Sequence, residues 1–335
     1  MKIAILDDYQ DAVRKLNCFS MLASHEVNIY NQFARGMSCL TSRMLEVDAI
    51  ILIGNRTRVN NAFLDKMPRL KLICQIGPCG DHIDLAACTA RNIAITEGQD
   101  TTVAPAELTW GLIIAAQRRI PQYIANLKQG AWQQAGLKSA TMPQNFRIGK
   151  TLSGQTLGIW GYGNIGRLVA RYGHAFNMKI LVWGSKASRH RAVEDGYLAA
   201  ESKEQFFASS DILTLHLRLL KETTNIVTMH DLALMKPDSL LVNTSRAELI
   251  QNGALAAAIA QGRPGLVAVD VFENEPILQG HNLLRTENAI CTPHIGYVEQ
   301  NAYETSFSEA FKNINDFFTG NYSKVINSAV FQSSF

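Results

Sequence analysis

Short apolar runs alternate with helical stretches along the first hundred residues of the chain. Residues 85–88, Leu-Ala-Ala-Cys, are typical of a helix between two such runs. An alternation of strands and helices of this kind predicts a parallel, doubly wound sheet. The runs that we expect to form its strands are Ile3–Leu6, Val27–Tyr30, Ala49–Ile53, Leu70–Ile76 and Ile93–Ile95.

A longer apolar pattern follows, from Thr101 to about Lys128, and it predicts one long helix. Pro121 lies inside this pattern and should kink or break the helix, because proline lacks the N–H and clashes with the preceding turn. The next segment, from Gln129 to Ser153, is polar and contains several glycines. We therefore expect the long helix to lead from the first sheet into a loop.

A second alternating series begins at Leu157 and ends near Cys291. Beyond it, Tyr297 to Phe318 has helical spacing of apolar residues and can cross back onto the first domain. The predicted fold class is α/β, with two doubly wound parallel-sheet domains. We expect residues 1–100 together with 297–335 to form one domain and residues 101–296 to form the other.

A glycine fingerprint stands near the middle of the chain, between a short buried strand, Leu157–Trp160, and a helical run. The first glycine makes a tight turn, the second lets the backbone approach a pyrophosphate, and the third lets helix pack on strand. The helix N-terminus then offers N–H groups and a partial positive charge to the phosphates. This pattern predicts a dinucleotide site. Its residues are Gly161, Tyr162, Gly163, Asn164, Ile165 and Gly166.

The acidic residue that usually follows this fingerprint is missing. The next strand, Lys179–Trp183, should end in Asp or Glu to hold the ribose hydroxyls, but it runs into Gly184 and Ser185. Lys186 and Arg189 follow at once. Loss of a carboxylate and gain of cations favour a ribose that carries a 2′-phosphate. The alternative is that these two cations are solvated loop charges.

The composition narrows the classes of function. The chain has 335 residues, of which 47% are hydrophobic and 18% charged, and its net charge of +3 is too weak to indicate nucleic-acid binding. No apolar run approaches the roughly 18 residues of a membrane span, and the N-terminus reads as a strand rather than a signal peptide. The six cysteines show neither a C-x-x-C pair nor metal-ligand spacing. We expect a cytoplasmic protein with reduced thiols and without a metal site.

Polar residues follow three strands of the second series. They stand at Asn243–Arg246, Asp270–Pro276 and Thr292–Gly296. Ligands of an open parallel sheet bind at the carboxyl ends of its strands, so we expect these groups to share one crevice with the glycine loop.

The residue types in these groups suit one reaction. An arginine can grip a carboxylate and polarise a carbonyl, and a histidine paired with a carboxylate can transfer a proton near neutral pH. With hydride from a nicotinamide, they would interconvert a 2-oxo acid and a 2-hydroxy acid. Each residue also has a structural alternative: Arg246 and Asp270 could cap helices, and Glu275 could lie in a surface turn.

The order of these motifs resembles the D-isomer-specific 2-hydroxyacid dehydrogenases, with matches over nearly the whole chain. Gly161–Gly166 is similar to the family's G-x-G-x-I-G, and Asn243–Ile250 to its N-x-S-R-G-E-L segment. Asp270–Pro276 is similar to D-V-F-x-x-E-P, and Thr292–Gly296 to T-P-H-I-G. The resemblance implies a Rossmann cofactor domain and a smaller, flavodoxin-like substrate domain made of the first hundred residues and the C-terminal helix.

The resemblance also implies catalytic roles. Arg246 would hold the substrate carboxylate, His294 would be the acid/base paired with Glu275, and Asp270 would face the nicotinamide side of the pocket. Arg218 stands where the family usually has proline, over the adenosine end of the cofactor. The cofactor contacts expected beyond the glycine fingerprint are Ser185, Lys186, Arg189, His216, Arg218, Thr244, Ser245, Asp270 and Gly296.

The substrate contacts would come from the first domain. Backbone N–H groups of the loop after Gln75 can bind a carboxylate, and Arg56 is a second candidate. Pro78 and Cys79 make this loop unusual for the family, so the substrate is not carried over from the resemblance. The residues expected to bind substrate are Arg56, Gly77, Pro78, Cys79 and Gly80.

The leading hypothesis is a reductase of a small 2-oxo acid that prefers NADP, with NAD as a possible cofactor. The long helix from Thr101 resembles the family's dimer-forming helix, which implies a homodimer. The alternative is a dinucleotide-sensing protein of the corepressor type. The joint presence of Arg246, Glu275 and His294 argues against a sensor, because sensing needs only the residues that bind the cofactor.

Overall fold

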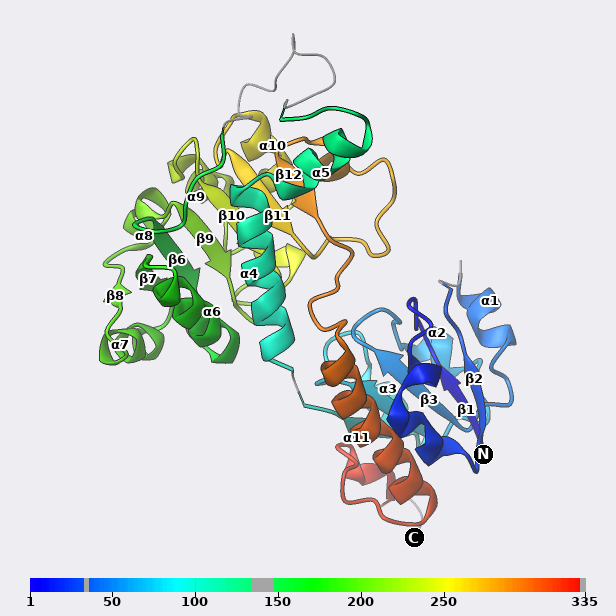
Figure 1. Ribbon diagram of the computed structural model, residues 1–335. Coiled ribbons are helices and arrows are strands. Elements are labelled where there is room, and N and C mark those ends of the chain that lie inside the picture. The colour runs from blue at the N-terminus through cyan, green and yellow to red at the C-terminus, as the bar shows by residue number, and fades with distance from the viewer. Residues whose placement is uncertain (33–35, 100, 134–147, 332–335) are drawn as a thin grey trace. The chain divides into compact units, whose positions relative to one another are not determined.

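The computed structural model describes residues 1–32, 36–99, 101–133 and 148–331 (Figure 1). These residues form two compact units, one made of Met1–Thr101 with Val298–Phe335 and one made of Thr102–Tyr297. The polar segment predicted from Gln129 to Ser153 lies largely outside the described residues.

The first unit contains a five-stranded sheet in which every neighbouring pair is parallel. The strand order is β2-β1-β3-β4-β5, the doubly wound order of flavodoxin-like folds. The strands are β1 (Lys2–Ile5), β2 (Glu26–Ile29), β3 (Ala49–Ile53), β4 (Leu72–Ile76) and β5 (Ala94–Glu97).

Helices cover this sheet because alternate strand residues point to opposite faces. On one face the apolar residues of α2 and α3 join a core that contains Ala4, Ile50 and Ile73. Along β4 and β5 lies α11, which buries Phe307 and Phe311 completely. The helices of this unit are α1 (Met37–Ser42), α2 (Asn61–Leu64), α3 (Leu85–Ala90) and α11 (Gln300–Phe318).

The second unit contains a seven-stranded sheet, also parallel throughout. The strand order is β12-β11-β10-β9-β6-β7-β8, so the order in which successive strands are added reverses between β6 and β9. The predicted fold class, two doubly wound α/β domains, is thereby confirmed. The strands are β6 (Thr156–Trp160), β7 (Lys179–Trp183), β8 (Leu198–Ala199), β9 (Ile212–Leu215), β10 (Leu240–Asn243), β11 (Leu266–Val269) and β12 (Ala289–Cys291).

Two separate apolar cores lie on the two faces of this larger sheet. One joins α4, α6 and α7 to residues such as Ile159 and Val242. The other joins α8, α9 and α10 to residues such as Leu213 and Leu241. The helices are α4 (Val103–Gln117), α5 (Ile120–Lys128), α6 (Asn164–Ala175), α7 (Lys186–Glu194), α8 (Lys203–Ser209), α9 (Met229–Leu234) and α10 (Ala254–Ala260).

The helical pattern predicted from Thr101 to Lys128 forms two helices, α4 and α5, so the break expected at Pro121 is confirmed. The break precedes Pro121, which lies in the first turn of α5, where a missing N–H costs little. Arg119 adopts a left-handed backbone, with a φ of 54°, and ends α4 in a position that more often holds glycine. Its side chain is almost fully buried and donates to Asn288 Oδ1 at 3.0 Å.

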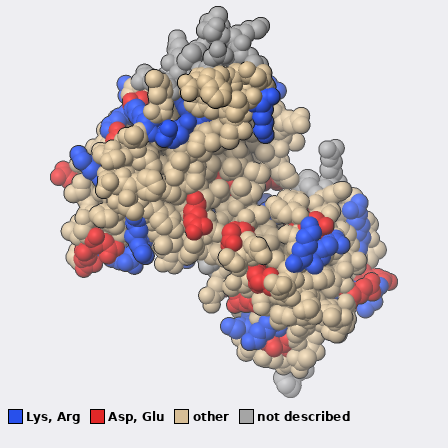
Figure 2. All heavy atoms as spheres, viewed as in Figure 1, with Lys and Arg blue, Asp and Glu red and all other residues tan. Residues whose placement is uncertain are grey.

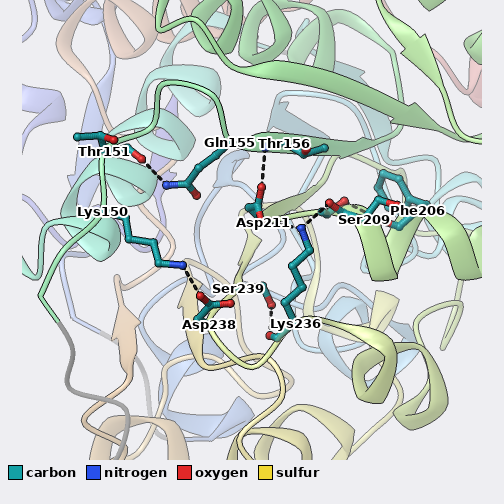
Figure 3. A network of polar contacts seen from close by, with 11 residues as sticks. Lys150, Thr151, Gln155, Thr156, Phe206, Ser209, Asp211, Lys236, Asp238 and Ser239 are labelled. Carbon is teal, nitrogen blue, oxygen red and sulfur yellow. Dashed lines mark hydrogen bonds and ion pairs between the residues drawn. The ribbon is translucent and has the colours of Figure 1, made fainter.

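A polar network ties the amino ends of neighbouring strands together (Figure 3). Asp211, just before β9, accepts the backbone N–H of Thr156 in β6 at 2.8 Å. Lys236, in the turn before β10, donates to Asp211 Oδ1 at 2.6 Å and to the carbonyl of Ser209 at 2.9 Å. These bonds set the relative heights of β6, β9 and β10, and thereby of the loops at their carboxyl ends.

The described residues contain neither a helix long and apolar enough to cross a membrane nor a group of three His, Cys, Asp or Glu side chains able to hold a metal. All six cysteines carry free thiols. On the face that Figure 2 shows, basic and acidic side chains form small groups separated by uncharged surface.

Candidate active site

The glycine fingerprint forms a tight turn between β6 and α6. Gly161 has a φ of 100°, and a Cβ there would lie 2.4 Å from the carbonyl oxygen of His216. A Cβ on Gly166 would lie 2.1 Å from the carbonyl oxygen of Gly161. At Gly163, by contrast, a Cβ would meet no atom within 4 Å. The turn is therefore closed on its inner side and open beside Gly163, as a pyrophosphate cradle requires.

The helix that follows this turn begins at Asn164 and runs for 12 residues. Its first N–H groups have no intrahelical acceptor, so they offer hydrogen bonds and partial positive charge to an anion. Ile165 packs against the core beneath. Tyr162 is buried, and its hydroxyl donates to Asp195 Oδ2 at 2.7 Å, so only its backbone remains for a ligand.

The residues after β7 form the start of α7. Ser185 caps this helix by accepting the N–H of Ser188 at 3.2 Å, and Lys186 is exposed. Arg189, one turn further on, lies over the ring of Trp183. Gly184 has a φ of 152°. Cationic side chains thus stand at the carboxyl end of the strand where an acid was missing from the sequence pattern.

The loop after β9 lies beside the glycine turn. The backbone N–H of His216 donates to the carbonyl of Trp160 at 2.8 Å. Burial lowers the pKa of His216 to about 4, so the imidazole is neutral at physiological pH. Its Nε2 is buried without a hydrogen-bond partner among the described residues, which leaves one polar atom for a bound ligand. Arg218 is exposed in the same loop.

The turn after β10 is built around the buried side chain of Asn243. Asn243 Oδ1 accepts the N–H of Ser245 at 3.0 Å, and its Nδ2 donates to the carbonyl of Arg246 at 2.8 Å. Ser245 Oγ donates to the carbonyl of Leu215 in β9 at 2.7 Å. Thr244 Oγ1 lies 2.7 Å from Thr109 Oγ1. These hydrogen bonds hold the turn in one conformation, and the half-buried Arg246 stands at its end.

His294 and Glu275 form a direct pair. His294 Nδ1 lies 2.7 Å from Glu275 Oε2, and Glu275 Oε1 accepts the N–H of Phe272 at 2.9 Å. Burial alone would raise the pKa of Glu275, but these two hydrogen bonds and the charges of His294 and Arg246 outweigh burial and lower it. Because Nδ1 faces the carboxylate, Nε2 of His294 is the atom available for proton transfer.

Asp270 holds the turn that carries His294. Its Oδ1 accepts the hydroxyl of Thr292 at 2.6 Å and the N–H of Ile295 at 2.9 Å, and its Oδ2 accepts the N–H of Gly296 at 2.9 Å. Burial raises the pKa of Asp270, although these hydrogen bonds oppose the shift. His294 lies within this turn at a φ of 52°, a conformation that needs such support.

In the first unit, Arg56 follows the carboxyl end of β3. Its guanidinium donates to the carbonyl of Asp7 at 2.6 Å and lies 4.5 Å from the centre of the Tyr9 ring. Thr57, the next residue, donates to Asp7 Oδ2 at 2.7 Å. The arginine is thus held in one place at the edge of the sheet.

The loop after β4 is also constrained. Gly77 has a φ of 79°, and Cys79 N–H donates to Glu97 Oε2 at 2.8 Å. That N–H is therefore not available to a substrate carboxylate, and Pro78 has none, which leaves Gly77 and Gly80. Burial, with Glu97 beside it, raises the pKa of the Cys79 thiol to about 12, so this thiol is not a nucleophile at neutral pH.

Sequence reasoning assigned no individual role to four residues that shape the site. Asn243 was readable in principle, since an asparagine at a strand end often closes a turn on its own backbone. Thr109, Trp183 and Thr292 carry no such signal, because their partners are distant in the sequence or lie across a turn.

The fold and the site define a class: a doubly wound dinucleotide-binding protein with a histidine–glutamate pair and an arginine after the carboxyl ends of its strands. A family model described as D-isomer specific 2-hydroxyacid dehydrogenase, NAD binding domain, matches residues 110–296. A glyoxylate reductase from Aeropyrum pernix is 37% identical over 258 residues, which are 76% of this chain and 75% of that protein.

Solved structures agree. A Ralstonia solanacearum protein, provisionally described as a D-3-phosphoglycerate dehydrogenase oxidoreductase, is 57% identical with a TM-score of 0.95, covering 98% of this chain and 97% of that one. A phosphoglycerate oxidoreductase from Vibrio cholerae is 49% identical with a TM-score of 0.91, covering 95% and 99%. The chain belongs to the D-isomer-specific 2-hydroxyacid dehydrogenase family, and its cofactor is a nicotinamide dinucleotide.

Proposed function

We propose that the protein reduces a small 2-oxo acid to the D-2-hydroxy acid and prefers NADPH to NADH. The observation that carries the reaction type is the His294–Glu275 pair at 2.7 Å, with the positive charge of Arg246 acting on the same carboxylate. Hydride transfer to a carbonyl requires one proton for the oxygen, and this pair is suited to supply it.

Each proposed role uses side-chain atoms that the contacts within the protein leave available to a ligand. A bound nicotinamide would supply the hydride to the carbonyl carbon. His294 would donate the proton from Nε2 to the carbonyl oxygen, while Glu275 stabilises the imidazolium on the Nδ1 side. Arg246 would bind the substrate carboxylate through its guanidinium and polarise the carbonyl. In the reducing direction His294 must begin protonated.

The preference for NADPH is inferred from charge. Gly184 and Ser185 supply no carboxylate to the ribose. Lys186 and Arg189 follow them in α7, and Arg218 lies in the loop after β9. Phosphate binds arginine and lysine through charge-assisted hydrogen bonds. The open side of the glycine turn at Gly163 and the unpartnered His216 Nε2 are consistent with a dinucleotide seated beside them. Thr244, Ser245 and Gly296 are proposed as further cofactor contacts.

The substrate is proposed to be small, such as glyoxylate, hydroxypyruvate or an aryl pyruvate. A glyoxylate reductase among the relatives supports the first of these. Arg56 and the Gly77–Gly80 loop are proposed as substrate contacts from the first unit. A cytoplasmic location and a homodimer stay predictions.

The test is a reductase assay with a panel of 2-oxo acids and both reduced cofactors. We expect turnover with NADPH at a higher kcat/KM than with NADH, and loss of turnover in His294→Ala with cofactor binding retained. Binding of cofactor without turnover across the panel would favour a dinucleotide sensor instead. Equal kcat/KM for the two cofactors would defeat the NADPH preference.

A matched variant tests the missing acid directly. Ser185→Asp is suited to this, because aspartate also caps helices well and α7 should stay folded. Gly184 is a poorer choice, since its φ of 152° disfavours any side chain. We expect Ser185→Asp to shift the preference toward NADH through repulsion of the 2′-phosphate. An unchanged preference would mean that this position does not face the ribose.

A further inference from the structure

Arg189 is held differently from the two other cations proposed to recognise the 2′-phosphate. Lys186 and Arg218 are exposed, whereas Arg189 is half-buried. Its guanidinium carbon lies 4.8 Å from the centre of the Trp183 ring, and its Nη1 donates to the carbonyl of Ala200 at 3.3 Å. Two contacts on different groups therefore fix the position of this guanidinium.

Trp183 is well placed to be a fixed platform. It is the last residue of β7, immediately before the missing acid, and its side chain packs against the core formed with α8 and α9. Ala200, the second contact, donates its own N–H to the carbonyl of Val182 at 2.9 Å. Both groups that hold Arg189 are thus anchored to the sheet.

The charge of Arg189 is not neutralised within the described part of the chain. Neighbouring basic residues have acidic partners: Arg167 pairs with Asp195 and His190 with Glu194. Arg189 has no ion pair among the described residues, and its Nε is buried without a hydrogen-bond partner there. A buried, unpaired donor on a cation is costly unless a ligand meets it.

We propose that Trp183 is a positioning residue for cofactor choice, because it holds the Arg189 guanidinium ready to bind the 2′-phosphate of NADPH. The inference rests on the proposed preference for NADPH. A free arginine loses side-chain entropy when it orders on a phosphate, and a guanidinium already stacked on an aromatic ring loses less. The aromatic ring also leaves the charge intact, which a carboxylate partner would not.

The experiment measures dissociation constants for NADPH and NADH by calorimetry on the full chain. The variants are Trp183→Leu, Trp183→Phe, Arg189→Ala and the double variant Trp183→Leu/Arg189→Ala. Trp132→Leu serves as the control, because Trp132 is 73% exposed and follows α5, outside the β7 and α7 residues of the proposed site. Binding of NADH reports whether each variant keeps a folded dinucleotide site.

We expect Arg189→Ala to weaken NADPH binding about tenfold, because one charge-assisted hydrogen bond is lost. Trp183→Leu should weaken NADPH about three- to fivefold, as expected for a lost cation–π contact, and Trp183→Phe should recover most of this. NADH binding should change less than twofold in all of these. In the Arg189→Ala background, Trp183→Leu should have no further effect on NADPH.

Two outcomes would overturn the positioning role. One is an equal loss for NADPH and NADH in Trp183→Leu, which would indicate a structural role alone. The other is that the losses of NADPH affinity in Trp183→Leu and Arg189→Ala add up in the double variant. Either result leaves the preference for NADPH standing in the wild type. If the wild-type chain binds NADH as tightly as NADPH, the proposed preference itself fails. Should Trp183→Leu not fold, Trp183→Met, alone and combined with Arg189→Ala, provides the same comparison, because it also removes the aromatic ring.

Discussion

At the scale of single residues, His294 is held by two carboxylates with different tasks. Glu275 contacts the imidazole itself, at 2.7 Å from Nδ1. Asp270 accepts the side-chain hydroxyl of Thr292 before it and the N–H groups of the two residues after it. Glu275 can stabilise a positive charge on the ring, and Asp270 sets the position of the turn that carries it.

The Glu275→Gln substitution tests the first task. The lowered pKa of Glu275 keeps its carboxylate ionised through neutral pH, and this negative charge is lost as the pH falls through the lowered pKa. The amide cannot stabilise the imidazolium by charge. We expect kcat/KM for reduction to fall about 10- to 100-fold, with its basic limb at lower pH. A pH profile with an unchanged basic limb would refute the pairing.

The Asp270→Asn substitution tests the second task. The amide nitrogen cannot accept the N–H groups that the carboxylate accepts, so the turn around His294 should loosen. We expect kcat to fall about 10- to 100-fold, as for a lost buried hydrogen bond, while the Kd for NADPH stays within about threefold. Steady-state kinetics and calorimetry separate the two quantities. A matching loss of NADPH affinity would instead place Asp270 against the cofactor, as the family resemblance implies.

At the scale of elements, two glycines of the β6–α6 turn are needed for close packing, and a third leaves room for a ligand. Gly161 and Gly166 face backbone atoms at 2.4 and 2.1 Å from their hypothetical Cβ atoms, so the turn could not close with larger residues. Gly163 faces open space. The fingerprint thus combines packing requirements with one opening.

Alanine substitutions should separate these uses. Gly166→Ala pushes a methyl group into the carbonyl of Gly161, and we expect a loss of about 2–3 kcal/mol in the free energy of unfolding. Gly163→Ala should change that free energy by less than about 1 kcal/mol, because there is room for the methyl group. It should nevertheless weaken NADPH about tenfold or more by filling the approach to the pyrophosphate. Denaturant unfolding measures the stability of both variants, and calorimetry measures their affinity for NADPH. A stable Gly166→Ala together with a destabilised Gly163→Ala would contradict this division.

At the scale of the whole molecule, each unit has its own core. The apolar clusters on the two faces of the larger sheet contain residues of Thr102–Tyr297 alone, and the core formed with α2 and α3 contains residues of the other unit alone. The proposed cofactor contacts all belong to the larger unit. Cofactor binding should therefore stabilise the larger unit more than the smaller one.

Hydrogen exchange can measure this linkage. NADPH at about 100 times its Kd should stabilise the unit that binds it by about 2.7 kcal/mol. We expect slower exchange at the start of α6 and in the loop after β9, with smaller changes in β1 to β5. Gly163→Ala should show little of this protection at the same NADPH concentration. Uniform protection of both units would contradict the assignment of the cofactor site to the larger one.

Much of this arrangement follows from local pattern. The buried strand Ala49–Ile53 was located to the residue, because a parallel strand covered on both faces is a continuous apolar run between polar ends. The polar groups after β10, β11 and β12 were likewise visible, since parallel strands bring their carboxyl ends to one edge.

Other features depend on contacts between distant parts of the chain. The end of α4 at Arg119 was not readable, because a left-handed arginine is stable only where its side chain finds Asn288. Asp270 could not be recognised as the support of the His294 turn, nor Trp183 as the platform for Arg189. Sequence pattern assigns residue types to strand ends, whereas only the packed fold decides which side chain each donor meets, because those partners come together after the sheet has formed.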